Sequence, residues 1–574
     1  MRRLTKKAVF LIVAGIVLAG TLYGRGRTES SAGGRPAGAP DTWIADRKIV
    51  IQVYIDDIGY TLPDNQSASP AFQEIKRRTG IDLQVNYTPG QNDMAVMASQ
   101  LAAGTIPDMI VAYLNNSTRP EFPVLLKAAK DGMFADLSTY FAGAKVYNRY
   151  LEPGFLPNDT RRNVMWRDDL AGKVYLVHLQ VPAVDRSLEF DATRNYVGGP
   201  YIQERIAQAL NIDVRNIRTS DDFYNLLTAI KNGNFRDNNG RPVTPLGPKY
   251  WGGSFDALAL CMPGLTWGVS DNYNITPEGK VLHEAETEWA MRRVNYARKL
   301  LAEGLMDQEF FTMDTSRTLE YYTNNSGAIM GDTHNYVDLI NQNGGWIPLN
   351  YLNDWQGDNR KISGGKTGYC VWAVSADARN PQEIFSFVDW LSTYEGQVLG
   401  QYGIEGLTYN MVNGMPRINT EVQGYLSAGE RTTLVNRYGF GFGGAGNDLF
   451  NVLVTNTDNI TNFGEERPGM SSSTQYSRAI EIGTKYPPAS IRLLEGLSAG
   501  AYLSDEGMTA IKARLDLLNY NEAIQQAIYA TSDAEAARII ENFRQQLVNA
   551  GVRDFEAHLE RIYKADPKAI NFRP

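Results

Sequence analysis

The stretch "RKIVIQVYID", Arg47 to Asp56, decides the fold class because it opens a regular alternation of strands and helices. Its β-branched residues alternate with polar ones, which is typical of a β-strand. The segment "SPAFQEIKRRTG" comes soon after, with Pro70 suited to a helix start and Gly80 suited to a helix end. Together the two segments predict a strand followed by a helix.

The alternation continues for two more strands. "IDLQVNYTPG" is a second alternating segment, and "QNDMAVMASQLAAG" has apolar residues at helical spacing up to Gly104. "IPDMIVAYLN", Ile106 to Asn115, is nearly all apolar, as in the middle of a parallel sheet. This order predicts a doubly wound α/β lobe.

Ligands of such sheets bind beyond the carboxyl ends of the strands. That rule places a group of polar residues near a crevice, although the Asp and Asn residues among them would equally suit turns. The group is Asp56, Asp57, Tyr113, Asn115 and Asn116.

Bulk composition excludes some classes of protein. The chain has 574 residues, of which 43% are hydrophobic and 21% charged, which fits a soluble globular protein of more than one lobe. The net charge is −8, and no basic block occurs outside the first seven residues. Nucleic-acid binding needs a concentrated basic surface, so we expect no nucleic-acid partner.

From Tyr201 onward the sequence favours helices. "DDFYNLLTAIKNG" is amphipathic, with Ser220 or Asp221 as the expected N-cap and Gly233 as the stop. "TEWAMRRVNYARKLLAEG" and "NPQEIFSFVDWLSTYEGQVLGQYG" each predict a further amphipathic helix, and the last 70 residues are helical nearly throughout.

The N-terminus has the layout of a secretory signal peptide, which we assign to residues 1–24. Four basic residues precede the uncharged run from Ala8 to Gly20, which is short for a membrane span of about 20 residues. Thr21 stands where a lipoprotein would carry its lipidated Cys, which argues against a lipid anchor. Residues 25–46 are predicted to be a flexible linker. We therefore expect a protein secreted across the cytoplasmic membrane, periplasmic or on the cell surface.

Several phrases resemble the family 1 extracellular solute-binding proteins of ABC importers, and above all their large LipO-like, oligosaccharide-binding subset. The phrases are "RKLLAEGLMDQEFFTMD", "NNSGAIMGD" and, from Asn380 to Asn410, "NPQEIFSFVDWLSTYEGQVLGQYGIEGLTYN". "IPDMIVA" and "GMFADLSTYF" resemble an early strand and helix of that family, and "FRQQLVNAGVRDFEAHLERIYKAD" resembles its closing helix.

The resemblance implies a two-lobed α/β fold, the type II periplasmic-binding-protein fold, with a helix-rich second lobe. Lobe 1 is expected to comprise residues 47–178 and 327–378, and lobe 2 residues 179–326 and 379–574. The implied function is to bind a carbohydrate, expected to be an oligosaccharide, between the lobes and to deliver it to ABC transporter permease subunits. We expect a monomer without a cofactor.

Some members of the family carry a calcium loop, but the corresponding "NFRDNNGRPVTP" departs from it. Phe235, Asp237 and Asn239 occupy the first three ligand places, and Val243 and Thr244 stand where carboxylates should follow. Calcium needs six to eight oxygen ligands, so we expect none here. The four His residues have no zinc-ligand spacing either, and no metal is predicted.

No catalytic residue is predicted. The sequence lacks a Gly-x-Ser-x-Gly elbow and a Walker loop, and the adjacent acids Asp168 and Asp169 are expected to point apart. A glycan-active enzyme, which would need two placed carboxylates, and a peptide-binding or sensor module remain the alternatives. Cys261 and Cys370 fit no metal motif and predict two buried thiols, with a disulfide as the alternative.

Aromatic residues are the main candidates for the ligand site, because sugar rings stack on Trp and Tyr. Trp251 and Trp267 lie beside glycines in predicted loops, where each is either a ligand platform or ordinary packing. Trp289 and Trp390 lie in amphipathic helices and are expected in the core. The other candidates are Tyr113, Asn115, Asp332, Trp355, Tyr369, Trp372 and Tyr438.

The segment "RYGFGFGGAGND", Arg437 to Asp448, contains the letters of a dinucleotide-binding fingerprint. Such a fingerprint belongs between a strand and a helix, but the residues that follow, "NDLFNVLVTN", do not read as a helix. We interpret it as a flexible loop that either lines the cleft or rearranges as the lobes close, with Tyr438 as a candidate ligand residue.

Overall fold

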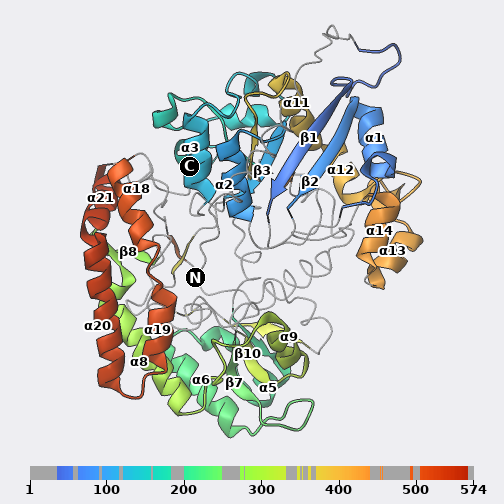
Figure 1. The fold of residues 1–574 in the computed structure, drawn as a ribbon. Coiled ribbons are helices and arrows are strands. Elements are labelled where there is room, and N and C mark those ends of the chain that lie inside the picture. The colour runs from blue at the N-terminus through green and yellow to red at the C-terminus, as the bar shows by residue number, and fades with distance from the viewer. Residues whose placement is uncertain are drawn as a thin grey trace, which may run out of the picture.

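The structure is a computed structural model, and a part of the chain is described in it. Figure 1 shows two sheet-containing lobes, one above the other, and a helical bundle along one side. The described residues are 35–55, 62–88, 93–114, 121–156, 159–182, 200–248, 272–276, 278–330, 345–349, 352, 360–362, 370–428, 430–439, 453, 455–456, 492–494 and 505–565.

The first lobe is built on a five-stranded sheet in the order β2-β1-β3-β13-β4. The three strands predicted from the N-terminal part of the sequence are parallel to one another, as expected, and β13 and β4 complete the sheet in antiparallel pairings. The strands are β1 (Arg47–Tyr54), β2 (Ile81–Tyr87), β3 (Met109–Tyr113), β13 (Cys370–Val374) and β4 (Val177–His178), and the helices α1 (Pro70–Thr79), α2 (Asp93–Ala103) and α3 (Glu121–Lys130) connect or follow them.

Helix α1 ends where the sequence predicts. Pro70 occupies its first turn, and Gly80 closes it in the left-handed conformation at φ 80°. A Cβ atom at Gly80 would lie 2.4 Å from the carbonyl oxygen of Ala45. Only glycine fits there, because the conformation disfavours other residues and the backbone of Ala45 passes too close.

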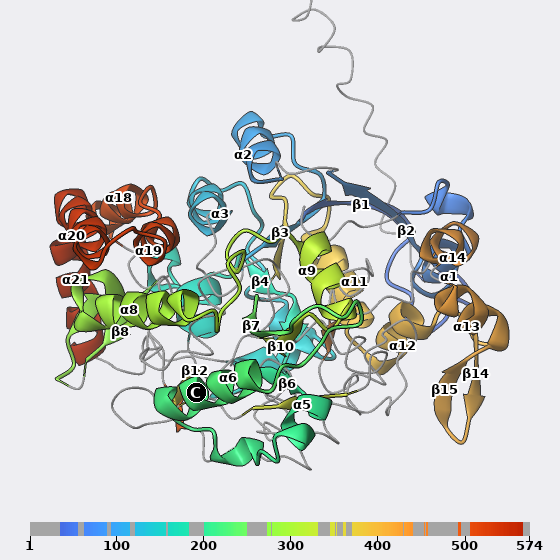
Figure 2. The same cartoon turned by 90° about the horizontal axis from the view of Figure 1, so that it is seen from below.

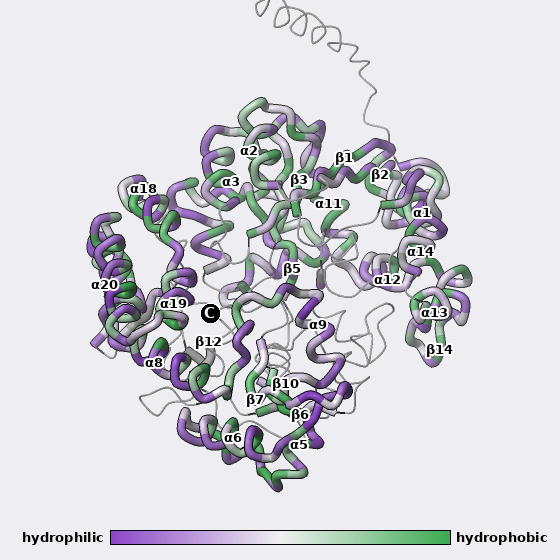
Figure 3. The backbone as a smooth tube through the Cα atoms, turned by 60° about the horizontal axis from the view of Figure 1, so that its bottom comes forward, coloured by the Kyte–Doolittle hydropathy of each residue, from purple (hydrophilic) through white to green (hydrophobic). Residues whose placement is uncertain are grey.

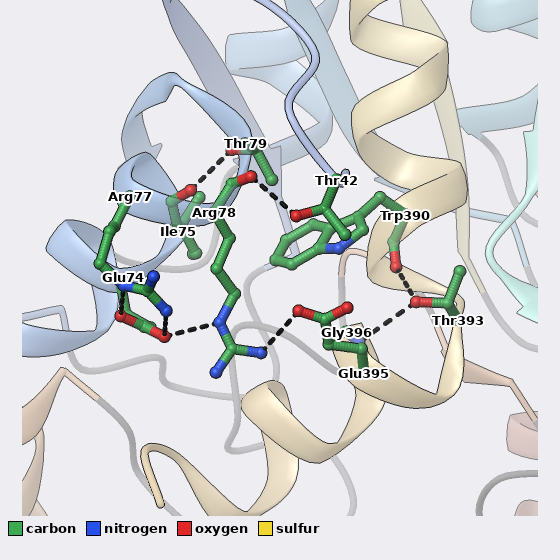
Figure 4. Close-up of polar contacts among 10 residues, drawn as sticks. All are labelled: Thr42, Glu74, Ile75, Arg77, Arg78, Thr79, Trp390, Thr393, Glu395 and Gly396. Carbon is green, nitrogen blue, oxygen red and sulfur yellow. Dashed lines mark hydrogen bonds and ion pairs between the residues drawn. The ribbon is translucent and has the colours of Figure 1, made fainter. Parts of the chain in front are cut away.

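That close contact comes from the segment before β1, which was predicted to be a flexible linker. From Thr42 onward this prediction is wrong. The Thr42 hydroxyl donates to the carbonyl of Arg78 over 2.8 Å (Figure 4). The Ile44 N–H donates to the carbonyl of Thr79 over 2.8 Å. The segment is therefore held on the C-terminal end of α1.

The second lobe contains a four-stranded sheet in the order β11-β6-β10-β7. Its interior strand β10 shows that the predicted lobe boundary is wrong, because residues from Gly327 were expected in lobe 1. Instead β10 pairs with β6 and β7, so the chain returns to the first lobe only after β11. The elements are β6 (Tyr201–Gln203), β7 (Thr244–Gly247), β10 (Gly327–Met330), β11 (Trp346–Pro348), α5 (Glu204–Ala209), α6 (Ser220–Asn232) and α9 (Thr315–Thr323).

The segment predicted as one helix from Asn380 forms two helices, α11 (Pro381–Leu391) and α12 (Tyr394–Tyr402). The chain breaks between them at Thr393, whose hydroxyl donates to the Trp390 carbonyl and accepts from the Gly396 N–H (Figure 4). Both helices belong to the first lobe, which corrects their assignment to lobe 2. Asp389 accepts backbone N–H groups of Lys145, Val146 and Tyr147, and Glu395 pairs with Arg78 of α1 at 2.9 Å.

A helical bundle forms the third part of the molecule. It packs around α8, and its buried ion pair joins Arg293 and Glu284, whose side chains are both 0% exposed. Figure 2 shows this bundle on one side and the hairpin β14–β15 projecting on the other. The bundle contains α8 (Glu288–Ala302), α18 (Glu506–Leu515), α19 (Tyr520–Ile528), α20 (Asp533–Ala550), α21 (Val552–Ala565), β8 (Tyr273–Ile275) and β9 (Val281–His283).

The remaining elements are short. Beside the hairpin β14 (Tyr409–Val412) and β15 (Met415–Ile418) lie α13 (Thr420–Ser427) and α14 (Arg431–Tyr438). Two small parallel pairings join β5 (Gln180–Val181) with β16 (Thr455–Asn456) and β12 (Arg360–Ile362) with β17 (Arg492–Leu494). Short helical turns cover Gln66–Ala68, Phe141–Gly143, Tyr147–Leu151, Asp159–Met165, Asp168–Leu170, Val214–Asn216 and Glu284–Glu286.

Hydropathy follows this architecture. In Figure 3 the chain is hydrophobic along β3 and β10, the interior strands of the two sheets, and mainly hydrophilic along α9. Within the described ranges, none of the helices has the length and apolar character needed to cross a membrane.

Candidate ligand-binding site

The carboxyl ends of the parallel strands locate the candidate site. In the first lobe β1, β2 and β3 end at Tyr54, Tyr87 and Tyr113, along one edge of the sheet. In the second lobe the parallel strands β7 and β10 end at Gly247 and Met330. Ligands of open α/β sheets bind beyond such ends. Figure 1 shows the lobes one above the other, and these two sets of strand ends are the candidate positions for a ligand.

Polar side chains are fixed along the first-lobe edge by mutual hydrogen bonds. Gln52 of β1 donates through Nε2 to the hydroxyl of Thr88 over 3.0 Å, and the Tyr54 hydroxyl donates to Oε1 of Gln100 on α2. Burial, and next the negative charge of Asp93, raise the pKa of Tyr54 to about 12. Tyr54 is therefore a neutral hydrogen-bonding group at physiological pH.

Two buried carboxylates begin the helices that follow β2 and β3. Asp93 lies in the first turn of α2 and is 4% exposed, and Glu121 lies in the first turn of α3 and is 6% exposed. A helix N-terminus stabilises a negative charge, which explains how both acids tolerate burial. Neither Asp93 nor Glu121 was predicted as a site residue from the sequence. The available signal was an acid opening each helix after a strand that ends at the expected crevice.

Tyr113 is the one predicted ligand residue that the structure describes at this edge. It ends β3, is half-buried, and lies opposite Cys370 of β13. Its role in ligand binding stays a prediction. Cys370 is fully buried, and Cys261 lies outside the described residues.

Trp372 was predicted to face the ligand, and this prediction is wrong. It lies in the middle of β13 and is 0% exposed. Its indole Nε1 donates to the hydroxyl of Tyr147 over 3.3 Å, and the two rings meet edge to face at 5.9 Å. Trp372 is thus part of the first-lobe core.

The prediction for Tyr438 is also wrong. Tyr438 is the last residue of α14 rather than a loop residue, and it is 3% exposed. Gly439 ends the helix at φ 83°, where a Cβ atom would lie 2.0 Å from the hydroxyl oxygen of Ser69. The helix end is therefore packed against Ser69, and Tyr438 itself is buried. Trp289 and Trp390 are buried, which confirms their placement in the core.

The other predicted site residues lie outside the described residues, so their roles stay predictions. The same holds for most of the glycine-rich segment, residues 440–452. The predicted residues concerned are Trp251, Trp267, Asp332, Asn115, Trp355, Tyr369, Asp56, Asp57 and Asn116.

Two short strands, β5 and β16, run side by side. β5 follows β4 directly and pairs in parallel with β16. Asn456 of β16 donates its backbone N–H to Oε1 of Gln397 over 3.0 Å, and its Nδ2 to the carbonyl of Ser392 over 2.9 Å. The β5–β16 pair is therefore fastened to α12 and to the break that precedes it.

The loop that corresponds to the calcium loop is closed by its own hydrogen bonds. Oδ1 of Asp237 accepts the N–H groups of Asn239 and Arg241 at 2.9 and 2.8 Å, and Oδ2 accepts the Ser326 hydroxyl at 2.9 Å. Among the described residues, no group of three or more His, Cys, Asp or Glu side chains is placed to hold a metal.

Comparison with known proteins tests the resemblance. No family model matches the sequence. The chain is 22% identical over 428 residues to lipoprotein LipO of Bacillus subtilis strain 168, covering 72% of this chain and 75% of LipO. It is also 22% identical over 429 residues to the polygalacturonan/rhamnogalacturonan-binding protein YtcQ of the same organism, covering 71% and 74% of the two chains.

Solved structures show the same fold. The alginate-binding protein AlgQ2, in a structure without calcium ion, matches 92% of this chain and all of its own at a TM-score of 0.60 and 17% identity. FusA of Streptococcus pneumoniae, an ABC-transporter substrate-binding protein in complex with kestose, matches 90% of this chain and 99% of its own at a TM-score of 0.59 and 15% identity. These relatives support the resemblance to the family 1 solute-binding proteins. The predicted two-lobed α/β fold is thereby confirmed.

Proposed function

We propose that this solute-binding protein is the extracytoplasmic component of an ABC transporter, binding an oligosaccharide between its lobes and delivering it to a membrane permease. The observation that carries the proposal is the presence of two separate sheets, each with parallel strands whose carboxyl ends are the usual place for a ligand of such sheets. Such a body can close over a ligand and present the closed form to a partner.

The names of the similar proteins support a carbohydrate ligand and a binding role. YtcQ is named for binding two polysaccharides, AlgQ2 for binding alginate, and FusA was solved with kestose. The acids considered for a glycosidase, Asp168 and Asp169, also favour a binding role over catalysis. The carboxylate of Asp169 is held in ion pairs by Arg167 at 2.7 Å and by Lys130 at 2.9 Å. We further propose that the chain acts outside the cytoplasm, on the strength of its signal-like N-terminus. That it acts as a monomer stays a prediction.

An oligosaccharide that binds between the lobes is expected to raise the melting temperature. A ligand that binds only the folded state at 100 times its Kd adds about 2.7 kcal/mol to the free energy of unfolding. Thermal melting against a panel of oligosaccharides and peptides measures this, with product analysis of each mixture. Stabilisation by peptides alone, or conversion of a sugar to products, would contradict the proposal.

Replacing Trp251 by Ala is expected to weaken oligosaccharide binding at least tenfold, a loss of about 1.4 kcal/mol. The physical reason is the loss of a stacking surface for the sugar ring. The unliganded melting temperature should stay nearly unchanged. Trp372→Ala is the matched control, since it removes a core ring and should cost about 3–5 kcal/mol of stability. A large fall in stability for Trp251→Ala would place Trp251 in the core instead.

A further inference from the structure

A groove lies on the outside of the first lobe, between α11 and the segment before β1. Its volume is about 360 Å³, within the range of about 300–1,000 Å³ that is usual for small-ligand sites. One wall is the segment 41–44, and the other is the face of α11 from Gln382 to Trp390. The two walls come together where Thr42 lies beside Trp390 (Figure 4).

The groove is separate from the candidate ligand positions at the strand ends. Arg47, the first residue of β1, pairs at 3.1 Å with Glu383, which lines the groove. Tyr54, the last residue of β1, lies at the first-lobe edge where a ligand is expected. An eight-residue strand places its two ends about 23 Å apart. The groove therefore lies at the opposite end of the sheet.

The acidic side chains of the groove already have partners. Glu383 pairs with Arg47, and Asp41 pairs with Arg35 at 2.7 Å. Asp389 accepts three backbone N–H groups through its two carboxylate oxygens. Because these charges are offset within the protein, the groove does not require a cationic ligand.

Four other polar side chains of the groove are available to a ligand. In the part of the chain that the structure describes, no residue forms a hydrogen bond or an ion pair with any of them. Amides and hydroxyls both donate and accept hydrogen bonds, and an ammonium group donates them. Such a set matches the hydroxyl groups of a sugar, which also donate and accept. The four are Lys145, Asn380, Gln382 and Ser386.

Trp43 adds an aromatic ring to the same groove. The ring is half-buried and packs over Gly80, where a Cβ atom would lie 2.7 Å from Cζ2 of the indole. The missing side chain of Gly80 thus lets the ring lie against the end of α1. An aromatic ring beside a few placed polar groups is the combination that binds sugar rings and their hydroxyls.

We propose that this groove is a second binding site on the outside of the first lobe, and that its ligand is a carbohydrate. Trp43 offers a stacking surface to one sugar ring. Gln382 and Ser386, one turn apart on α11, pair with the hydroxyl groups of the sugar. The site goes beyond the proposed function, because it requires neither the strand ends nor closure of the lobes. The chain can hold two saccharide units at the same time.

The number of ligands bound per chain tests the proposal. Xylo-, fructo- and galacturono-trisaccharides are titrated into the full chain by calorimetry, since a trisaccharide is too short to occupy both sites. The expected result is two molecules per chain for a sugar that binds. One molecule per chain, bound equally well after substitution of Gln382 and Ser386, overturns the second site and leaves the proposed function standing.

A matched pair of double variants assigns the second molecule to the groove. Gln382→Ala with Ser386→Ala is expected to weaken one of the two binding events at least tenfold, because hydrogen bonds to the sugar are lost. The control is Gln423→Ala with Ser427→Ala, the same residue types at the same spacing on α13. It should leave both binding events unchanged. Equal effects of the two double variants would overturn the assignment.

Substitutions of Trp43 separate stacking from packing. Trp43→Leu is expected to weaken the same binding event at least tenfold, whereas Trp43→Phe should retain most of the affinity. Equal affinities of the two variants would show that the ring is only structural and would overturn its role. Melting curves without ligand confirm that each variant is folded before affinities are compared.

Three further outcomes separate this inference from the proposed function. A single bound sugar that is lost in the Gln382 and Ser386 variant would support the groove and contradict binding between the lobes. Peptides that bind at the groove in place of every sugar would overturn the inference. Absence of binding by any carbohydrate would overturn the inference and the proposed function together.

Discussion

Replacing Arg293 by Met is expected to lower the free energy of unfolding by about 3–5 kcal/mol, the usual cost of removing one partner from a buried ion pair. Arg293 and Glu284 are both fully buried, with Nη1 and Oε1 3.1 Å apart. Oε1 of Glu284 also accepts the hydroxyl of Tyr520 on α19 over 3.2 Å. The substitution leaves the Glu284 carboxylate in the interior of the bundle without its guanidinium.

Chemical denaturation of the purified chain measures this loss. Arg292→Met is the matched control, because the neighbouring Arg292 is half-exposed and its pair with Glu288 lies on the surface. A surface pair contributes at most about 1 kcal/mol. The double substitution Arg293→Met with Glu284→Leu should recover much of the stability, since it removes both charges. Equal losses for Arg292→Met and Arg293→Met would show that the buried pair is not the cause.

The second large effect concerns two glutamates that share one guanidinium. Glu286 and Glu556 have side chains that are 5% exposed, and Arg553 approaches them at 2.7 and 3.5 Å. The backbone N–H of His283 donates to Glu556 over 2.7 Å. Burial, and next the hydrogen bond with Glu286, raise the pKa of Glu556 from 4.5 to about 9. The pair therefore holds a proton at neutral pH.

This raised pKa predicts a stability that falls as pH rises. Between pH 5 and pH 9 the folded chain holds a proton on Glu556 that the unfolded chain has released, so unfolding is favoured with increasing pH. Relative to Glu556→Gln, which cannot ionise, the unmodified chain is expected to lose about 2–4 kcal/mol over this range. The two should be similar near pH 5.

Unfolding curves recorded from pH 5 to pH 9 provide the measurement. The adjacent His283 does not titrate in the folded chain over this range, because burial and next the charge of Lys512 lower its pKa to about 3. Glu560→Gln, which removes a surface carboxylate paired with Lys564 one turn further along α21, serves as the control. Parallel curves for the unmodified chain and Glu556→Gln would rule out proton binding by this pair.

Local patterns predicted the local structure well. The alternating segments became β1 and β2, and the caps at Pro70, Gly80 and Gly233 lie where composition placed them. The N-cap of α6 was off by one residue. Thr219 takes that place because its side chain accepts the Asp222 N–H while Asp222 accepts the Thr219 N–H, an arrangement that fixes the helix start.

The pairing of strands that are far apart in the sequence could not be predicted in the same way. The phrase "NNSGAIMGD" was recognised, but nothing in "GAIM" specifies whether its strand joins the first or the second sheet, which depends on hydrogen bonds to β6 and β7. The same limit explains Trp372. An apolar strand such as "CVWAV" shows that its residues are buried, but not that Tyr147 occupies the space beside the indole. Burial of Asp93 and Glu121 depends on loops and helices that come together only in the folded chain.

The docked segment before β1 has a mechanical consequence. Thr42 and Ile44 fasten the incoming chain to α1, and Arg47 pairs with Glu383 of α11, so any pull applied upstream acts on the first lobe alone. A chain held by its N-terminus would therefore be held through α1 and the first-lobe sheet, and not through the second lobe.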